Sequence, residues 1–274
     1  MREFQQVDVF TDTPYYGNPV AVVLDAEGLS DEEMQRFAAW TNLSETTFVL
    51  PPVSADADYQ VRIFTPSSEL PFAGHPTLGT CHAWQSVHGQ RDTTVQECAA
   101  GLVTVRRTPE GLAFAAPPLL RSGPVEPELL ERIATALGIA VDEIVDAQWA
   151  DNGPGWVAVL LPDADAVLAL DPAFRDALHI GVAGPHPEGG PARYEVRAFA
   201  PLGGSGCVED PVTGSLNASL AQWLLSSGRT TAPYTARQGT ALGRSGRVRI
   251  DTDEQDRIWV GGSTVTCVDG TVVI

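Results

Sequence analysis

Two stretches of the chain share one pattern of hydrophobic and polar positions. "YQVRIF" at 59–64 and "YEVRAF" at 194–199 alternate large apolar with polar residues, which is typical of a β-strand whose side chains change face at every residue. Each stretch leads into a loop of Pro, Gly and Ser and then into an apolar helical pattern. The sequence therefore predicts one strand, loop and helix unit twice. The two copies lie 135 positions apart, as the valines Val61 and Val196 show.

A proline stands near the predicted start of each helix. Without gaps, Pro76 matches Pro211, and the residues before them are His75 and Asp210. Proline suits the first helical position because its missing N–H would have no partner there. We therefore expect His75 and Asp210 near helix N-caps, where unpaired N–H groups and the positive dipole end can hold an anion.

The other elements indicate two halves of similar make-up. The period is too long for a solenoid or propeller repeat, whose units span about 20 to 50 residues. Ser30 and Glu33 form a capping-box pattern that predicts a helix. Further strands are expected at 4–10, 20–24, 46–50, 102–107, 112–116, 156–161, 247–250, 257–260 and 263–268, with a helix at 128–137. We predict a mostly antiparallel α+β fold, divided into halves 1–120 and 121–274, each with strands around a central helix.

Composition and charge exclude several partners. The chain is 43% hydrophobic and 19% charged, which is enough to form buried cores. Its net charge of −18, from 17 basic and 35 acidic residues, argues against nucleic acid and anionic membranes as partners. The start lacks signal-peptide features, no apolar run is long enough for a membrane span, and the cysteines form no C-x-x-C pair. We expect a cytoplasmic protein with reduced thiols and no metal site.

Three side chains are the first candidates for chemistry, and each has a structural alternative. Glu45 stands at the mouth of the strand in "NLSETTFV", where an exposed charge is also common. His75 is held at a loop-to-helix junction. Asp210 could be a plain N-cap. Ser215 and Thr80 could be ordinary helix hydroxyls. "GGSGCVEDPVTG" lacks both nucleotide-binding fingerprints, so no cofactor is expected.

The motifs "GNPVAVV", "NLSETTFV", "IFTPSSELPFAGHPTLGT", "NGP" and "VEDPVTGS" together resemble the PhzF family of phenazine-biosynthesis isomerases, which is similar in fold to diaminopimelate epimerase. The resemblance covers essentially the whole chain. It implies two pseudo-symmetric halves, each a barrel-like antiparallel sheet around a helix, with the active site in the cleft between them. It also implies a homodimer. It assigns catalytic roles to Glu45, His75 and Asp210, and substrate contacts to Ser44, Gly74, Gly214 and Ser215.

Three functions follow as hypotheses. The first is a cofactor-independent isomerase of a small carboxylate, such as trans-2,3-dihydro-3-hydroxyanthranilate, in which Glu45 moves a proton along one face of the substrate. The second is an amino-acid epimerase or a lyase that uses His75 and Asp210 on opposite faces. The epimerase relatives use a pair of cysteines, but Cys207 matches Phe72 in the other copy, so no thiol pair is available. The third is a carboxylate-binding protein without turnover.

Overall fold

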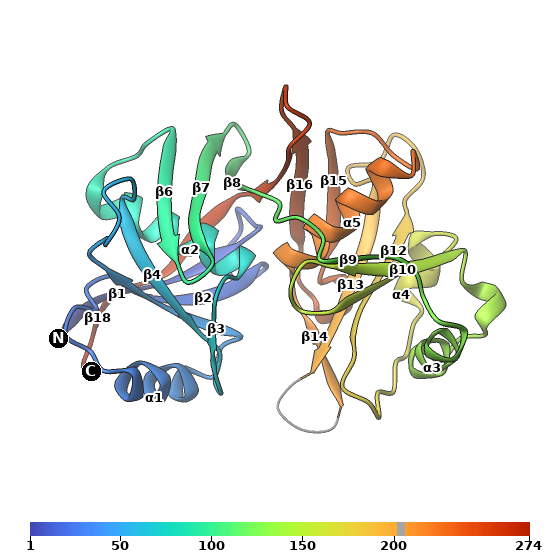
Figure 1. Cartoon of the computed structure of the whole chain (residues 1–274), viewed down its shortest axis with the longest axis horizontal. Helices are drawn as coiled ribbons and strands as arrows, with labels where there is room; N and C mark the ends of the chain where they lie inside the picture. The colour runs from blue at the N-terminus through green and yellow to red at the C-terminus, as the bar shows by residue number, and fades with distance from the viewer. Residues whose placement is uncertain (202–205) are drawn as a thin grey trace. The chain divides into compact units, whose positions relative to one another are not determined.

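The computed structural model describes residues 1–201 and 206–274 (Figure 1). The chain divides into two compact units, of which unit 1 comprises Met1–Ala115 with Gly261–Ile274, and unit 2 comprises Ala116–Val260. The final segment departs from the predicted halves. The last strand, β18 (Thr264–Val272), pairs antiparallel with β1 (Arg2–Val9), so residues 261–274 belong to the first unit and not to the second.

Unit 1 is a curved sheet with a buried helix. Its further elements are β2 (Asn18–Val23), α1 (Asp31–Thr41), β3 (Glu45–Leu50), β4 (Tyr59–Phe64), β5 (Glu69–Leu70), α2 (Gly74–His88), β6 (Thr93–Cys98), β7 (Gly101–Thr108) and β8 (Gly111–Ala115). Parallel pairs β2–β3 and β4–β6 interrupt an otherwise antiparallel set. The first eight residues of α2 are all buried, and the helix packs against β1, β2, β3 and β8.

Unit 2 repeats this topology. Its elements are β9 (Arg121–Pro124), α3 (Pro127–Leu137), η1 (Val141–Glu143), β10 (Asp146–Asp151), β11 (Trp156–Leu160), α4 (Ala164–Leu168), β12 (His179–Pro185), β13 (Tyr194–Pro201), β14 (Cys207–Asp210), α5 (Gly214–Ser226), β15 (Tyr234–Gln238), η2 (Thr240–Leu242), β16 (Gly246–Thr252) and β17 (Ile258–Gly262), which crosses the unit boundary. The parallel pairs are β11–β12 and β13–β15, at the places of β2–β3 and β4–β6. The predicted α+β fold of two pseudo-symmetric halves is confirmed.

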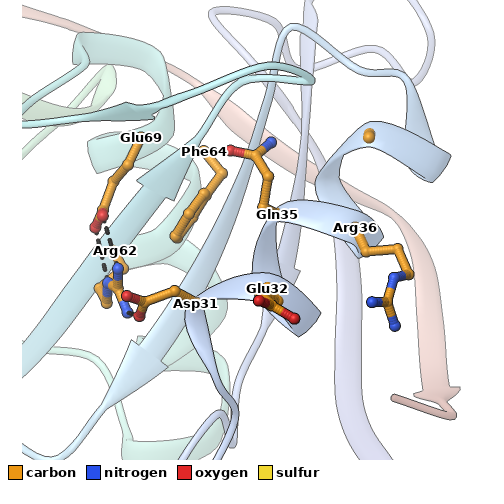
Figure 2. A pocket seen from close by; sticks show the side chains of 8 residues that line it. Asp31, Glu32, Gln35, Arg36, Arg62, Phe64 and Glu69 are labelled. Carbon is orange, nitrogen blue, oxygen red and sulfur yellow. Dashed lines mark hydrogen bonds and ion pairs between the residues drawn. The ribbon is translucent and has the colours of Figure 1, made fainter.

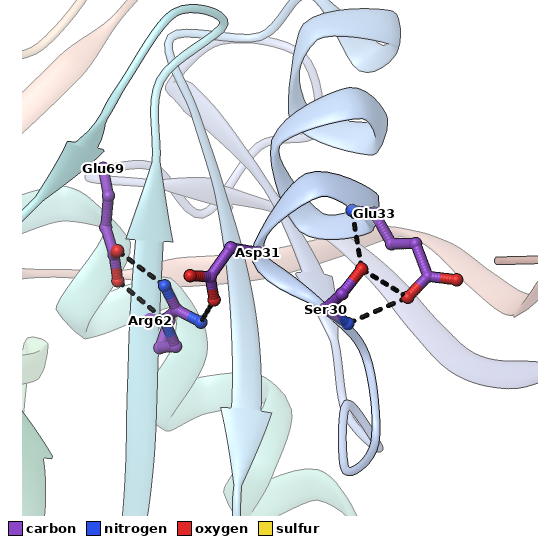
Figure 3. Close-up of polar contacts among 5 residues, drawn as sticks. All are labelled: Ser30, Asp31, Glu33, Arg62 and Glu69. Atoms are coloured by element: carbon purple, nitrogen blue, oxygen red, sulfur yellow. Dashed lines mark hydrogen bonds and ion pairs between the residues drawn. The ribbon is translucent and has the colours of Figure 1, made fainter.

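Helix α1 shows how local sequence sets an element. The Ser30 hydroxyl accepts a hydrogen bond from the Glu33 N–H at 3.3 Å, and the Ser30 N–H donates to Glu33 Oε2 at 2.8 Å (Figure 3). This is the predicted capping box, which satisfies two N–H groups that a helix start leaves unpaired. Met34 and Ala38, four residues apart on one face, are then buried against Phe48 of β3 and its neighbours. The cap and the apolar stripe together fix the helix on the sheet.

The two copies of the strand, loop and helix unit differ by an insertion. Phe64 pairs with Glu69 across the β4–β5 hairpin, and Phe199 pairs with Glu209 across β13–β14. Because 4 residues separate the first pair and 9 the second, the central helices are related by 140 positions, whereas the strands are related by 135. The ungapped match of His75 with Asp210 is therefore wrong beyond the hairpin.

The corrected register changes both helix starts. Helix α2 begins at Gly74 and α5 at Gly214, so the structural counterpart of His75 is Ser215. Neither proline occupies the first helical position, since Pro76 is the third residue of α2 and Pro211 precedes α5 by three residues. Proline is tolerated throughout the first turn because N–H groups there have no acceptor within the helix.

Candidate active site

Glu45 and His75 meet in unit 1. Glu45 is the first residue of β3 and follows the exposed Ser44, while His75 is the second residue of α2. Their side chains are 16% and 6% exposed, and His75 Nε2 lies 3.5 Å from Glu45 Oε2. The Thr80 hydroxyl donates to Thr47 Oγ1 at 2.8 Å, which fastens α2 to β3 two residues from Glu45. The structure thus brings two of the three predicted catalytic side chains together.

Burial controls the charge of His75. Loss of hydration lowers the pKa of the imidazole to about 3, so the ring is neutral at pH 7. Asn18, a fully buried residue at the start of β2, has its amide nitrogen 3.4 Å from His75 Nδ1. A neutral imidazole offers one donor and one acceptor nitrogen. His75 can therefore hydrogen-bond on both sides without adding a positive charge beside Glu45.

The starts of α2 and α5 differ from that of α1. The N-cap residues Ala73 and Thr213 make no side-chain cap bond, and neither first turn contains an acidic residue. Helix α1, in contrast, has a capping box and three acidic residues in its first turn. The first N–H groups of α2 and α5 and their positive dipole ends are thus suited to an anionic ligand. Neither His75 nor Asp210 is an N-cap, so the explanation that they merely cap their helices is wrong.

Asp210 and Ser215 flank the start of α5 in unit 2. Asp210 ends β14, and its Oδ2 accepts a hydrogen bond from the Thr213 hydroxyl. The Ser215 hydroxyl oxygen accepts from the Trp156 indole N–H at 3.0 Å. The Asn152 side-chain amide donates to the Ser215 carbonyl at 2.9 Å. Asp210 and Ser215 are therefore both held by hydrogen bonds from the side chains of other residues.

Sequence reasoning missed several of these holding residues. Asn18 and Asn152 stand in the motifs "GNPVAVV" and "NGP", but no role was assigned to either. Asn18 begins the buried strand β2 and Asn152 precedes the buried strand β11, and each contacts the second residue of the central helix, His75 or Ser215. The repeated motif was therefore the signal. Gln238, which contacts Asp210 and Thr213, carries no local signal in the sequence. The expectation that the two helix starts face one cleft stays a prediction.

A surface hollow of about 500 Å³ lies apart from these residues (Figure 2). It is lined by Asp31, Glu32, Gln35, Arg36, Ala39, Arg62, Phe64 and Glu69, none of which is a predicted site residue. The Arg62 guanidinium in it is already paired with Asp31 and Glu69. The hollow contains neither Glu45 nor His75 nor a residue of the α2 or α5 helix start, so it is not the candidate active site.

Within residues 1–201 and 206–274, no three or more His, Cys, Asp or Glu side chains are grouped as metal ligands would be. In the same part of the chain no helix is both long enough and apolar enough to cross a membrane.

Comparisons with known proteins agree with the predicted family. The profile of the phenazine biosynthesis-like protein family (PhzC-PhzF) matches residues 7–270. Antisense-enhancing sequence 1 of Schizosaccharomyces pombe is 37% identical over 297 residues, covering 98% of both chains. Trans-2,3-dihydro-3-hydroxyanthranilate isomerase of Pseudomonas fluorescens is 35% identical over 287 residues, covering 100% of both. A PhzF-family protein of Bacillus anthracis has the same fold, with a TM-score of 0.85 at 24% identity over 100% of this chain and 99% of that one.

These relatives confirm the prediction of an isomerase, since several curated ones bear that name. Full-length coverage of the matched proteins means that the likeness includes both units. The chain belongs to the phenazine biosynthesis-like PhzC-PhzF family.

Proposed function

We propose that the chain is a cofactor-independent isomerase of a small carboxylate, with trans-2,3-dihydro-3-hydroxyanthranilate as the first candidate substrate. The 35% identity to enzymes named for that substrate supports the choice. The observation that carries the proposal is the pair formed by Glu45 and the neutral, buried His75, whose Oε2 and Nε2 are 3.5 Å apart. Phenazine and antibiotic biosynthesis, a cytoplasmic location and a homodimer remain part of the proposal.

Glu45 is the acid/base in this mechanism. It removes the proton beside the hydroxyl-bearing carbon and returns it elsewhere in the conjugated system. One carboxyl group that takes and returns a proton moves hydrogen along a single face of the substrate. His75 assists by hydrogen bonding. Because its pKa is about 3, it stays neutral and does not bind Glu45 as an ion pair, so Glu45 can alternate between carboxylate and acid.

The remaining candidates bind and orient the substrate. The first N–H groups of α2, at Gly74 and His75, and of α5, at Gly214 and Ser215, are suited to its carboxylate and to negative charge that develops during proton transfer. Ser44 is exposed beside Glu45. In this proposal Asp210 contacts the substrate from unit 2, as a second acidic group near the start of α5.

An isotope experiment distinguishes the three hypotheses. The substrate carries deuterium at the carbon that loses its proton, and the protein is incubated with it in water. We expect NMR to show conversion, with deuterium appearing at a second carbon. Exchange at one carbon with inversion would instead indicate an epimerase. Stabilisation of the fold by carboxylates, with no conversion and no exchange, would indicate a binding protein and refute the proposal.

A further inference from the structure

Gln238 is the centre of a buried hydrogen-bond network in unit 2. It is the last residue of β15 and is fully buried. Its Oε1 accepts from the Thr213 backbone N–H at 3.1 Å and from the Asn217 amide at 2.8 Å. Its Nε2 donates to the Asp210 carbonyl at 3.1 Å and to the Thr213 hydroxyl oxygen at 3.0 Å. Both lone pairs and both protons of the side-chain amide are thus used.

Backbone partners fix the orientation of this amide. A backbone N–H can only donate and a backbone carbonyl can only accept. The Thr213 N–H therefore requires the oxygen of Gln238 on its side, and the Asp210 carbonyl requires the nitrogen on the other. Asn217 is oriented in the same way, because its amide also donates to the Thr213 carbonyl at 2.9 Å. The backbone partners therefore determine which atom donates and which accepts in each of these bonds, and neither side-chain amide can be turned the other way round.

The fixed amide sets the direction of the Thr213 hydroxyl. That oxygen accepts a hydrogen bond from Gln238 Nε2, which can only donate. The single proton of the Thr213 hydroxyl is therefore left to be donated to another acceptor. Its partner is Oδ2 of Asp210. A hydrogen bond donated to a carboxylate stabilises the ionised form. The chain of hydrogen bonds from Gln238 through the Thr213 hydroxyl to Asp210 therefore favours an ionised Asp210 with Oδ2 as an acceptor.

Unit 1 supports its helix start with a glutamine from a different register position, since Gln96 of β6 corresponds to Ala236 of β15 and not to Gln238. Gln96 donates to the Thr77 hydroxyl at 3.0 Å in the first turn of α2, whereas Gln238 accepts from Asn217 in α5. The N-cap that corresponds to Thr213 is Ala73, which has no hydroxyl to donate. The donor is thus found in the unit that has Asp210 at this strand position, where unit 1 has Leu70. Unit 1 supports its helix start without an N-cap hydroxyl, so support of the helix does not by itself require one.

We propose that Gln238 and Thr213 are positioning residues for Asp210: Gln238 directs the Thr213 hydroxyl, and this hydroxyl holds Oδ2 of Asp210 as an acceptor. The inference rests on the proposed role of Asp210 in catalysis, but the bonds and their direction can be tested without a substrate.

The first test measures the protonation of Asp210 directly. The ¹³C signal of its carboxyl group, assigned with Asp210→Asn, is followed from pH 7 downward in Thr213→Val and Thr213→Ser. Loss of one hydrogen bond to the charged form should raise the titration midpoint in Thr213→Val by about one pH unit. Thr213→Ser should restore the wild-type midpoint. The adjacent Glu209 and its partner Arg197 are the same in all variants. An unchanged midpoint in Thr213→Val overturns the inference.

The second test measures turnover of trans-2,3-dihydro-3-hydroxyanthranilate. Thr213→Val and Gln238→Leu should lower kcat by up to about 10²-fold with a smaller change in KM, because a misplaced group near the reacting atoms costs rate. Thr213→Ser should recover most of kcat. The control is Gln85→Leu, since Gln85 is also buried and donates to Thr94 Oγ1 at 2.8 Å but has no role in the proposed site. It should lower the Tm and leave kcat nearly unchanged.

The two tests separate the two proposals. If the wild type does not turn over the substrate, or if Asp210→Asn retains full kcat, the role of Asp210 in the proposed function fails, and the titration still decides the inference. If Asp210→Asn is slow but Thr213→Val has normal kcat and a normal Asp210 titration, the inference fails and the proposed function stands.

Discussion

Arg62 of β4 and Arg197 of β13 make the same ion pair in the two units. Arg62 donates from Nε and Nη2 to the two carboxylate oxygens of Glu69, at 2.7 and 2.6 Å. Arg197 donates from the same atoms to Glu209, at 3.1 and 2.8 Å. The side chains are 23% and 37% exposed in the first pair, and 7% and 9% in the second. One interaction is thus present in two different solvent environments.

This difference predicts unequal costs for the same substitution. Glu209→Gln leaves the buried Arg197 charge without its counter-ion and should lower the free energy of unfolding by about 3 to 5 kcal/mol. Glu69→Gln should cost about 0 to 1 kcal/mol, because water solvates Arg62 and Asp31 remains beside it. Denaturant unfolding of both variants provides the measurement. Equal losses would contradict the burial argument.

Glu45→Gln should lower kcat for the proposed isomerisation by about 10² to 10⁴-fold, since an amide cannot take and return the proton. Stopped assays by NMR or absorbance measure the rate. Glu69→Gln removes a carboxylate from the same unit, away from the site, and serves as the control with kcat close to wild type. A Glu45→Gln protein that folds, binds the substrate and isomerises it at the normal rate would eliminate the mechanism.

The neutral state of His75 predicts how stability depends on pH. Its pKa is about 3 in the folded protein and about 6.5 in the unfolded chain, so the unfolded state binds the extra proton between these values. The resulting loss in the free energy of unfolding is absent above pH 6.5 and grows by about 1.4 kcal/mol for each pH unit below that value. Denaturant unfolding at pH 7, 5.5 and 4.5 should therefore show a smaller acid loss in His75→Asn than in the wild type. Parallel pH curves for the two proteins would show that His75 is protonated in the fold.

Close packing of α2 on β2 predicts the effect of a single methyl group. A Cβ on Gly79 would lie 2.3 Å from Val20 Cγ1, so Gly79→Ala should destabilise the protein by about 1 to 3 kcal/mol despite the better helix propensity of alanine. Val20→Ala removes the clash, and the double variant should lose less than the two single losses combined. Gly270→Ala, with open space around its Cβ, is the control. Strictly additive losses would show that the contact is not the cause.

Local patterns predicted the elements well, and long-range relations less well. The capping box at Ser30 and the repeated strand are encoded by neighbouring residues, and both are present. The insertion between Phe199 and Glu209 carried no such signal, because a proline lies near the start of each helix whether the two copies are aligned with or without a gap. His75 was thus matched with Asp210, although Ser215 is its counterpart. The partner of β18 was missed for a related reason, since a short alternating strand does not specify which sheet it joins.

The pairing of β1 with β18 affects the order in which the protein can fold during its synthesis. Unit 2 is a continuous stretch, so all of its residues have emerged from the ribosome once Val260 has cleared the exit tunnel. Unit 1 begins first but lacks its edge partner for Arg2–Val9 until Thr264–Val272 has been made. The half translated first is therefore the half completed last, and until then β1 exposes backbone N–H and C=O groups that can pair with other chains.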